Sequence, residues 1–397
     1  MTLLEVITKA TANPEPPTSD SKHPFILNPD EIFINLKPQS EESDDIPLIK
    51  SLTGWQISRT DSELILSADK FFKKLKRNLK NPKTFNKESF LVLLNSFLEN
   101  NRAKIGVPLV VDTSNESYTR VLIEKLGFSM GSHVARLVIE ACVVLEFWEI
   151  LETIVVNRLV EHSNYSSLVS NLVEKKRSDL LCLCIKHFAD LRSHDLVLIL
   201  KYFLSPSQDG YSGMSSVRKE WESQALLSIE KATDKSLKGK KLRLAKEAAV
   251  LLMIAYDEFS VYELCLHYLL SPMNVDEVIL SSAIGMLNGF EMMGLIRYLG
   301  KWLRKYEKFP QAGPCAKASS VLGLKACEWV PRLEDIVKCI GLVVDEHFSS
   351  LVLHPEFHVE LRSIEGVVNS LALEARLCCS MANMVENLKS GARDALV

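Results

Sequence analysis

The stretch NVDEVILSSAIGMLNGFEMMGLIRYLGKWLRKY, residues 274–306, decides the fold class of this chain. Asn274 and Glu277 stand at the spacing of a capping box, and Asp276 adds the negative charge that a first helical turn favours. Gly289 is a residue type typical of helix ends. The sequence therefore predicts a helix that begins at Asn274 and stops at Gly289. Its expected core residues are Val278, Ala283, Ile284 and Leu287.

A second helix follows, because apolar side chains recur at intervals of three and four positions, which places them on one face. These residues are Leu295, Tyr298, Leu299, Trp302, Leu303 and Tyr306. Two helices joined by a short connection pair antiparallel. The unit is thus a helix hairpin with a shared apolar side.

The segment VPRLEDIVKCIGLVVDEHFSSLVLHP, residues 330–355, predicts the next core helix. Pro331 suits a first turn, and Glu334 and Asp335 complement the helix dipole. The expected buried stripe is Leu333, Ile336, Val337, Ile340, Val344, Phe348 and Leu351. An aspartate at Ile340 or Phe348 would then bury an unpaired charge and unfold the C-terminal half. Residues 356–389 read as one long helix or two consecutive helices.

From about Asp61 onward, helices of ordinary length alternate with short polar turns, and no strand-like alternation occurs. A weak echo, YFLSP at 202–206 and YLLSP at 268–272, hints at stacked pairs, although chance similarity of helix ends explains it equally well. We expect an all-α fold over residues 61–397, built of stacked antiparallel pairs like an α-solenoid, with a candidate sub-boundary near 205–235.

Residues 1–60 have a different composition. Prolines concentrate between Thr11 and Ser51, together with an acidic cluster at 41–45. Such a composition predicts a linker that is mostly disordered.

The whole chain has the composition of a folded globular protein, with 397 residues, 47% hydrophobic and 24% charged. Its formal net charge of −3 does not mark it as a general polyanion binder, so nucleic-acid contact would come from local patches. No uncharged run is long enough for a bilayer, and residues 1–10 lack a secretory signal. We expect a protein of the cytosolic or nuclear side that does not enter membranes.

The nine cysteines are scattered through apolar stretches and read as reduced core residues. The best candidate metal ligands are Cys339, His347, His354 and His358, but a paired first half of a zinc site is missing and Pro355 interrupts the shared face. Cys182, Cys184 and His187 raise the same question. We predict no metal site, no cofactor and no catalytic site, because no phosphate loop or nucleophile pattern occurs.

A basic amphipathic helix is the strongest functional signal in the residues themselves. Its cations alternate with Phe71, Phe72 and Leu75. The candidate patch comprises Lys70, Lys73, Lys74, Lys76, Arg77 and Lys80, with Lys83 and Lys87 beyond it. It fits a nuclear-import signal or a contact with RNA phosphates, a membrane surface, or the solvated face of an ordinary helix. A second basic run, from Lys235 to Lys246, reads as a charged helix start or loop.

The apolar helix that runs into Val344, Asp345, Glu346, His347 and Phe348, followed by an apolar run closed by Pro355 and a long last helix, resembles the nucleolar protein 11 family. The resemblance extends over roughly residues 64–392 and is strongest over 262–357. Members join an N-terminal β-propeller to a C-terminal helical domain, and no propeller pattern occurs in this chain.

The resemblance implies a nucleolar scaffold of ribosome biogenesis, in the UtpA subcomplex of the small-subunit processome. Such a protein supports transcription of the ribosomal RNA precursor and its early processing to small-subunit RNA, through protein contacts and, at basic patches, contact with the precursor. The alternative is a cytosolic or membrane-associated helical adaptor unrelated to ribosome assembly.

Overall fold

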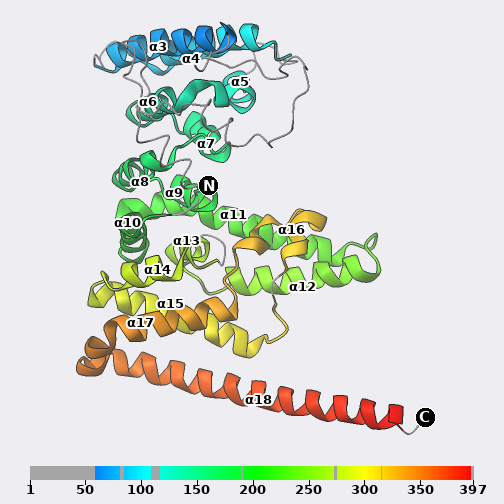
Figure 1. The fold of residues 1–397 in the computed structure, drawn as a ribbon. Helices are drawn as coiled ribbons and strands as arrows, with labels where there is room; N and C mark the ends of the chain where they lie inside the picture. The colour runs from blue at the N-terminus through cyan, green and yellow to red at the C-terminus, as the bar shows by residue number, and fades with distance from the viewer. Residues whose placement is uncertain are drawn as a thin grey trace, which may run out of the picture. The chain divides into compact units, whose positions relative to one another are not determined.

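A computed structural model describes residues 59–80, 85–108, 117–188, 191–271, 275–313 and 315–394 (Figure 1). The described residues are helical and contain no strand, which confirms the predicted all-α class. The chain divides into two units, residues 1–65 and 66–397, and the helix contacts described below lie within the second. Apart from residues 59 and 60, the linker predicted over 1–60 lies outside the described residues.

The helices of the described residues have the following bounds. They are α3 (Arg59–Leu79), α4 (Lys87–Ile105), α5 (Tyr118–Leu126), η1 (Gly127–Met130), α6 (Gly131–Val144), α7 (Trp148–Val156), η2 (His162–Asn164), α8 (Tyr165–Glu174), α9 (Ser178–His187), α10 (Ser193–Leu204), α11 (Gln208–Thr233), α12 (Gly239–Tyr256), α13 (Val261–Leu270), α14 (Glu277–Ile284), α15 (Gly289–Lys308), α16 (Ala316–Leu322), η3 (Lys325–Trp329), α17 (Leu333–Leu353), η4 (Pro355–Phe357) and α18 (His358–Asp394).

Successive helix pairs stack on their neighbours. Helix α5 packs on α4 and α7, α7 on α9, and α8 on both α9 and α10. Helix α11 packs on α9, α12 and α13, and α10 on α13 and α14. The last layer is formed by α15, α17 and α18. A single hydrophobic core therefore continues from layer to layer, as in a solenoid. The candidate sub-boundary near 205–235 falls on the continuous helix α11.

Three tight turns repeat in this stack without glycine. Glu146, Arg158 and Lys176 adopt φ values of 52°, 54° and 56°, the left-handed region. In each turn the next residue donates its N–H to a carbonyl five positions back, as Phe147 does to Cys142 at 2.8 Å. This bond closes the helix end in the Schellman pattern, where sequence reading looks for glycine.

We expect Arg158→Gly to stabilise the protein by about 0.5–1 kcal/mol. The left-handed conformation costs a residue with a side chain about 1–2 kcal/mol, which glycine avoids. Glycine loses more backbone entropy on folding, and this loss offsets part of the gain. Arg158 is exposed, so little packing is lost. Thermal unfolding should show a higher Tm for Arg158→Gly and an unchanged Tm for Arg158→Ala. Equal Tm values for the two variants would contradict the strain assigned to this turn.

The two helices predicted over 274–306 are present with different ends, but the predicted antiparallel pairing is wrong: α14 packs on α10 and α17, and α15 packs on α17 and α18. Helix α14 begins at Glu277, where Asp276 caps it by accepting the N–H of Val278, and Asn274 lies outside the described residues. Gly289 does not stop α14, which ends at Ile284. It opens α15 behind the cap Asn288, whose side-chain oxygen accepts the N–H of Glu291, while the Glu291 carboxylate accepts the N–H of Asn288.

The burial predicted for these two helices is confirmed with one exception. Val278, expected in the core, is 77% exposed because it lies in the first turn of α14, outside the face that meets α10 and α17. The other expected core residues of α14 and α15 are buried, namely Ala283, Ile284, Leu287, Leu295, Tyr298, Leu299, Trp302, Leu303 and Tyr306.

Helix α17 departs further from its predicted stripe. Its buried row is Ile336, Cys339 and Val343, whereas Val337 and Phe348 are exposed. The helix is kinked at His347, whose φ of −118° and ψ of 19° are not helical. The His347 Nε2–H group donates to the carbonyl of Ile284 at 2.8 Å, which ties the kink to the end of α14. Ile336 and Leu351 are buried as predicted, whereas Val337 before the kink and Phe348 directly after it were wrongly placed in the core.

By length and mean hydropathy alone, residues 118–144 could cross a membrane, which the search for uncharged runs did not indicate. In the structure this stretch is α5, η1 and α6, and 56% of the tested window is buried. Core helices of globular proteins pass the same test, so it assigns no membrane span.

Candidate interaction surfaces

The basic patch predicted near the start of the fold lies on the outer face of α3. Phe71 and Leu75 are buried beneath it, and Phe71 stacks on Phe97 of α4 with ring centroids 4.4 Å apart. All six candidate residues are exposed: Lys70, Lys73, Lys74, Lys76, Arg77 and Lys80. Lys83 lies outside the described residues. The patch is therefore a solvated cationic face anchored by an apolar one, available for phosphate or an import receptor.

Replacement of Lys73, Lys74, Lys76 and Arg77 by alanine should leave the Tm nearly unchanged, since exposed substitutions alter stability by about 0.5 kcal/mol or less. Nuclear entry or recovery of the ribosomal RNA precursor should fall if the patch acts as expected. Microscopy of a fluorescent fusion and RNA recovery measure both. Unchanged location and RNA recovery would remove the patch from the functional account.

The second basic run forms the turn between α11 and α12 and the first turns of α12, as expected. Lys235 and Lys238 lie in the turn, and Lys240, Lys241 and Arg243 lie on α12, all exposed. Arg243 donates to Glu247 at 2.8 Å, one helical turn away. This run is the charged tip of a helix hairpin.

The metal-ligand candidates are not brought together. Cys339 is buried on α17, while His347 and His358 bond the carbonyls of Ile284 and Val352 at 2.8 and 3.0 Å. Cys182 and Cys184 are buried in α9. Among the described residues, no group of three ligand-type side chains could hold a metal ion.

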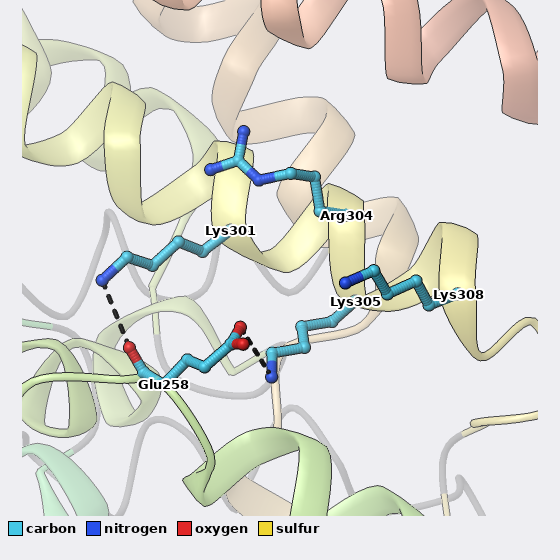
Figure 2. Close-up of a pocket in the computed structure, with 5 residues that line it drawn as sticks. All are labelled: Glu258, Lys301, Arg304, Lys305 and Lys308. Carbon is cyan, nitrogen blue, oxygen red and sulfur yellow. Dashed lines mark hydrogen bonds and ion pairs between the residues drawn. The ribbon is translucent and has the colours of Figure 1, made fainter.

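A small pocket of about 270 Å³ opens between α15 and the turn before α13, and Figure 2 shows its five lining residues. They are Glu258, Lys301, Arg304, Lys305 and Lys308. Lys305, only 8% exposed, binds the carboxylates of Asp257 and Glu258, both at 3.0 Å. Lys301 binds the buried carboxylate of Glu263 at 2.8 Å.

Two of the four cations in this pocket are thus neutralised by the protein's own carboxylates. Arg304 donates to the hydroxyl of Ser363 on α18 at 3.3 Å. Ion pairs thus join α15 to α13 and to the turn before it, and the hydrogen bond of Arg304 adds a link to α18. We interpret the pocket as a set of ion pairs that hold the last layer together, because a buried charge is costly unless it is paired.

A group of large exposed apolar side chains lies elsewhere, at two turns that contact each other. Ser281 and Ile284 of α14 bond Glu346 and His347 of α17, and Gly289 lies against Phe357. These contacts bring the α14–α15 turn beside the α17–α18 turn. The exposed residues of the two turns, here called the turn face, are Met286, Phe290, Phe348, Val352, Leu353 and Val359. Phe348 is 63% and Leu353 75% exposed.

Helix α18 carries a second apolar surface along its outer half. Its first part packs on α15, with Ile364 buried against Gly300 and Leu371 partly buried. From residue 372 to 386 every side chain is exposed, and Figure 1 shows α18 running on past the end of α15. The large exposed side chains there are Leu373, Leu377, Met381, Met384 and Val385.

The cysteines follow this division of α18. Seven are buried, as predicted, and burial raises the pKa of the Cys339 thiol to about 12. Cys378 and Cys379 are exposed on the outer half of α18, so their assignment to the core was wrong. Sequence reading missed both apolar surfaces, because a spacing of three and four positions does not show whether a helix face is covered.

Comparisons of the chain with protein-family models, with curated proteins and with solved structures found no match.

Proposed function

We propose that this chain is a non-catalytic, cofactor-free scaffold of small-subunit ribosome production. It would act in the nucleolus, within the UtpA part of the processome, and support transcription and early processing of the ribosomal RNA precursor. The resemblance of residues 330–355 to the nucleolar protein 11 family supports this assignment. That segment contains α17.

The observation that carries the proposal is the turn face on α17. Phe348, Val352 and Leu353 belong to residues 330–355, the segment that resembles the family, yet their side chains are exposed. The core contacts of α17 are made by Ile336 and Cys339. Contiguous exposed apolar side chains mark protein–protein interaction sites. Aromatic residues at the centre of an interface contribute most to its affinity. The turn face would bind a protein of the UtpA assembly, with Phe348 as its anchor.

The cationic face of α3 supports the same assignment in a second way. Its six exposed cations could neutralise phosphates of the precursor RNA, in a contact that weakens with salt and reads no sequence. A stack of helices separates such surfaces and holds each in place. The function would therefore rest on extended surface and need no chemical step.

Affinity purification of the tagged chain from its own cells tests the proposal. Recovery of propeller-rich UtpA proteins together with the 5′ part of the ribosomal RNA precursor is the expected result. Recovery of cytosolic or membrane-associated partners without that RNA would replace it with the helical-adaptor alternative.

A further inference from the structure

We propose that the outer half of α18 is the docking site for one amphipathic helix of a partner protein, with basic residues along the edges of its apolar face. The inference concerns a different surface from the turn face and holds whether or not the chain acts in ribosome assembly.

The first step is the continuity of α18 with an interface that already exists inside the molecule. Ile364 packs on Gly300 of α15, and Leu371 continues that contact one heptad later. Further steps of seven residues along the same line reach Cys378 and Val385, both exposed. A seven-residue repeat keeps one seam facing a partner helix. Past the end of α15, that seam has no helix on it among the described residues.

The second step is the size of the residues along the uncovered seam. Ala375, Cys378 and Ala382 are small and exposed, whereas Ile364 and Leu371 are large. Small residues allow a partner backbone to approach closely, and its own larger side chains would fill the space above them. Leu377, Met381 and Met384 extend the apolar surface to one side. The surface thus has the shape of a shallow seat for one helix.

The charged residues along the edges of the seam are acidic. Glu360 pairs with Arg297 of α15 at 3.0 Å, at the edge of the existing contact. Glu374 lies fourteen residues further along the same line of α18, and Glu386 lies at the opposite edge of the seam; both are exposed. An Arg or Lys of the incoming helix would repeat the Glu360–Arg297 pair at Glu374. Charges at such edge positions select the partner helix.

A second copy of this stretch matches the seam less well. Within residues 372–386 the single cation is Arg376, which lies on the far side of the helix from Glu374. Two copies would therefore oppose acidic edges without a cation in reach. The occupant favoured by the seam is a basic-edged helix from another protein.

The test uses the purified full chain and two synthetic 21-residue helical peptides with leucine at the heptad core. One carries Lys and Arg along its edges and the other Glu. Fluorescence anisotropy should show the basic peptide binding at least tenfold more tightly than the acidic one, with protection of Cys378 from alkylation. The double variant Glu374→Lys/Glu386→Lys should reverse that preference.

Ala375→Arg/Ala382→Arg should abolish binding of the basic peptide, whereas the matched pair Ser380→Arg/Asn383→Arg, on the polar side, should leave it unchanged. Equal affinity for both peptides, or binding that ignores the seam variants, would overturn the proposal. So would light scattering that shows a dimer of the purified chain, if Ala375→Arg/Ala382→Arg dissociates it, because the seam would then bind a second copy. Recovery of processome proteins plays no part in these readouts.

Discussion

Ile336→Asp should unfold the C-terminal layer of this protein. Ile336 is completely buried on α17, in the row that packs toward α14 and α15. A carboxylate there would lose its hydration without gaining a partner, at a cost on the order of 4 kcal/mol or more. Circular dichroism should show a large loss of helix signal or a much lower Tm.

Phe348→Asp, twelve residues further on the same helix, is the matched comparison. Phe348 is 63% exposed, so the same chemical change should alter stability by only about 0.5 kcal/mol. This reverses the expectation from the sequence, which placed Phe348 in the core. If Phe348→Asp unfolded the protein as severely as Ile336→Asp, the outward position of Phe348 after the kink would be wrong.

The second large effect concerns His267, which lies at the centre of the aromatic core. Its Nε2–H group donates to the carbonyl of Ala255 at 2.9 Å, and its Nδ1 accepts from the hydroxyl of Tyr298 at 2.8 Å. The rings of Phe259 and Trp302 lie 4.8 and 5.0 Å away. Burial lowers the pKa of His267 to about 3, because an imidazolium there would lose its hydration.

The sign of the pH effect follows from this shift. Between about pH 6.5 and pH 3 the unfolded chain binds a proton that the folded chain does not, so stability falls as pH falls, by up to about 1.4 kcal/mol per pH unit. His267→Gln should be less stable than the wild type at pH 7. The difference between them should shrink by roughly 2–3 kcal/mol on going to pH 4.5.

Urea unfolding of the wild type and of His267→Gln at both pH values measures this difference. A His267→Gln difference that stays constant between pH 7 and 4.5 would show that His267 titrates normally in the folded protein.

Much of the fold follows from local chemistry that a sequence displays. Apolar spacing located α15 and its buried face, because Tyr298 and Trp302 repeat every three or four positions along an uninterrupted helix. The absence of proline after Pro355 predicted either one long helix or two consecutive helices, and the structure has one, α18. The turns at Glu146, Arg158 and Lys176 could not be predicted. Residues of these types disfavour a left-handed backbone, and the packing of the neighbouring helices imposes it.

The candidate surfaces were predicted unevenly for a related reason. Cationic residues are almost always solvated, so the face of α3 could be identified from lysines alone. Apolar residues are ambiguous, because a stripe looks the same whether another helix covers it or not. Phe348 and Cys378 could be placed only once it was known which faces of α17 and α18 are covered by other helices, and that α15 ends at Lys308.

Purification of Phe348→Asp/Val352→Asp beside the wild-type chain tests most directly whether the chain works through the α17 residues of the turn face. Both side chains are exposed, so the variant should fold with an unchanged Tm. The account predicts that it loses the UtpA proteins and precursor RNA that the wild type recovers. A stable variant that recovers the same proteins and RNA as the wild type would contradict the account.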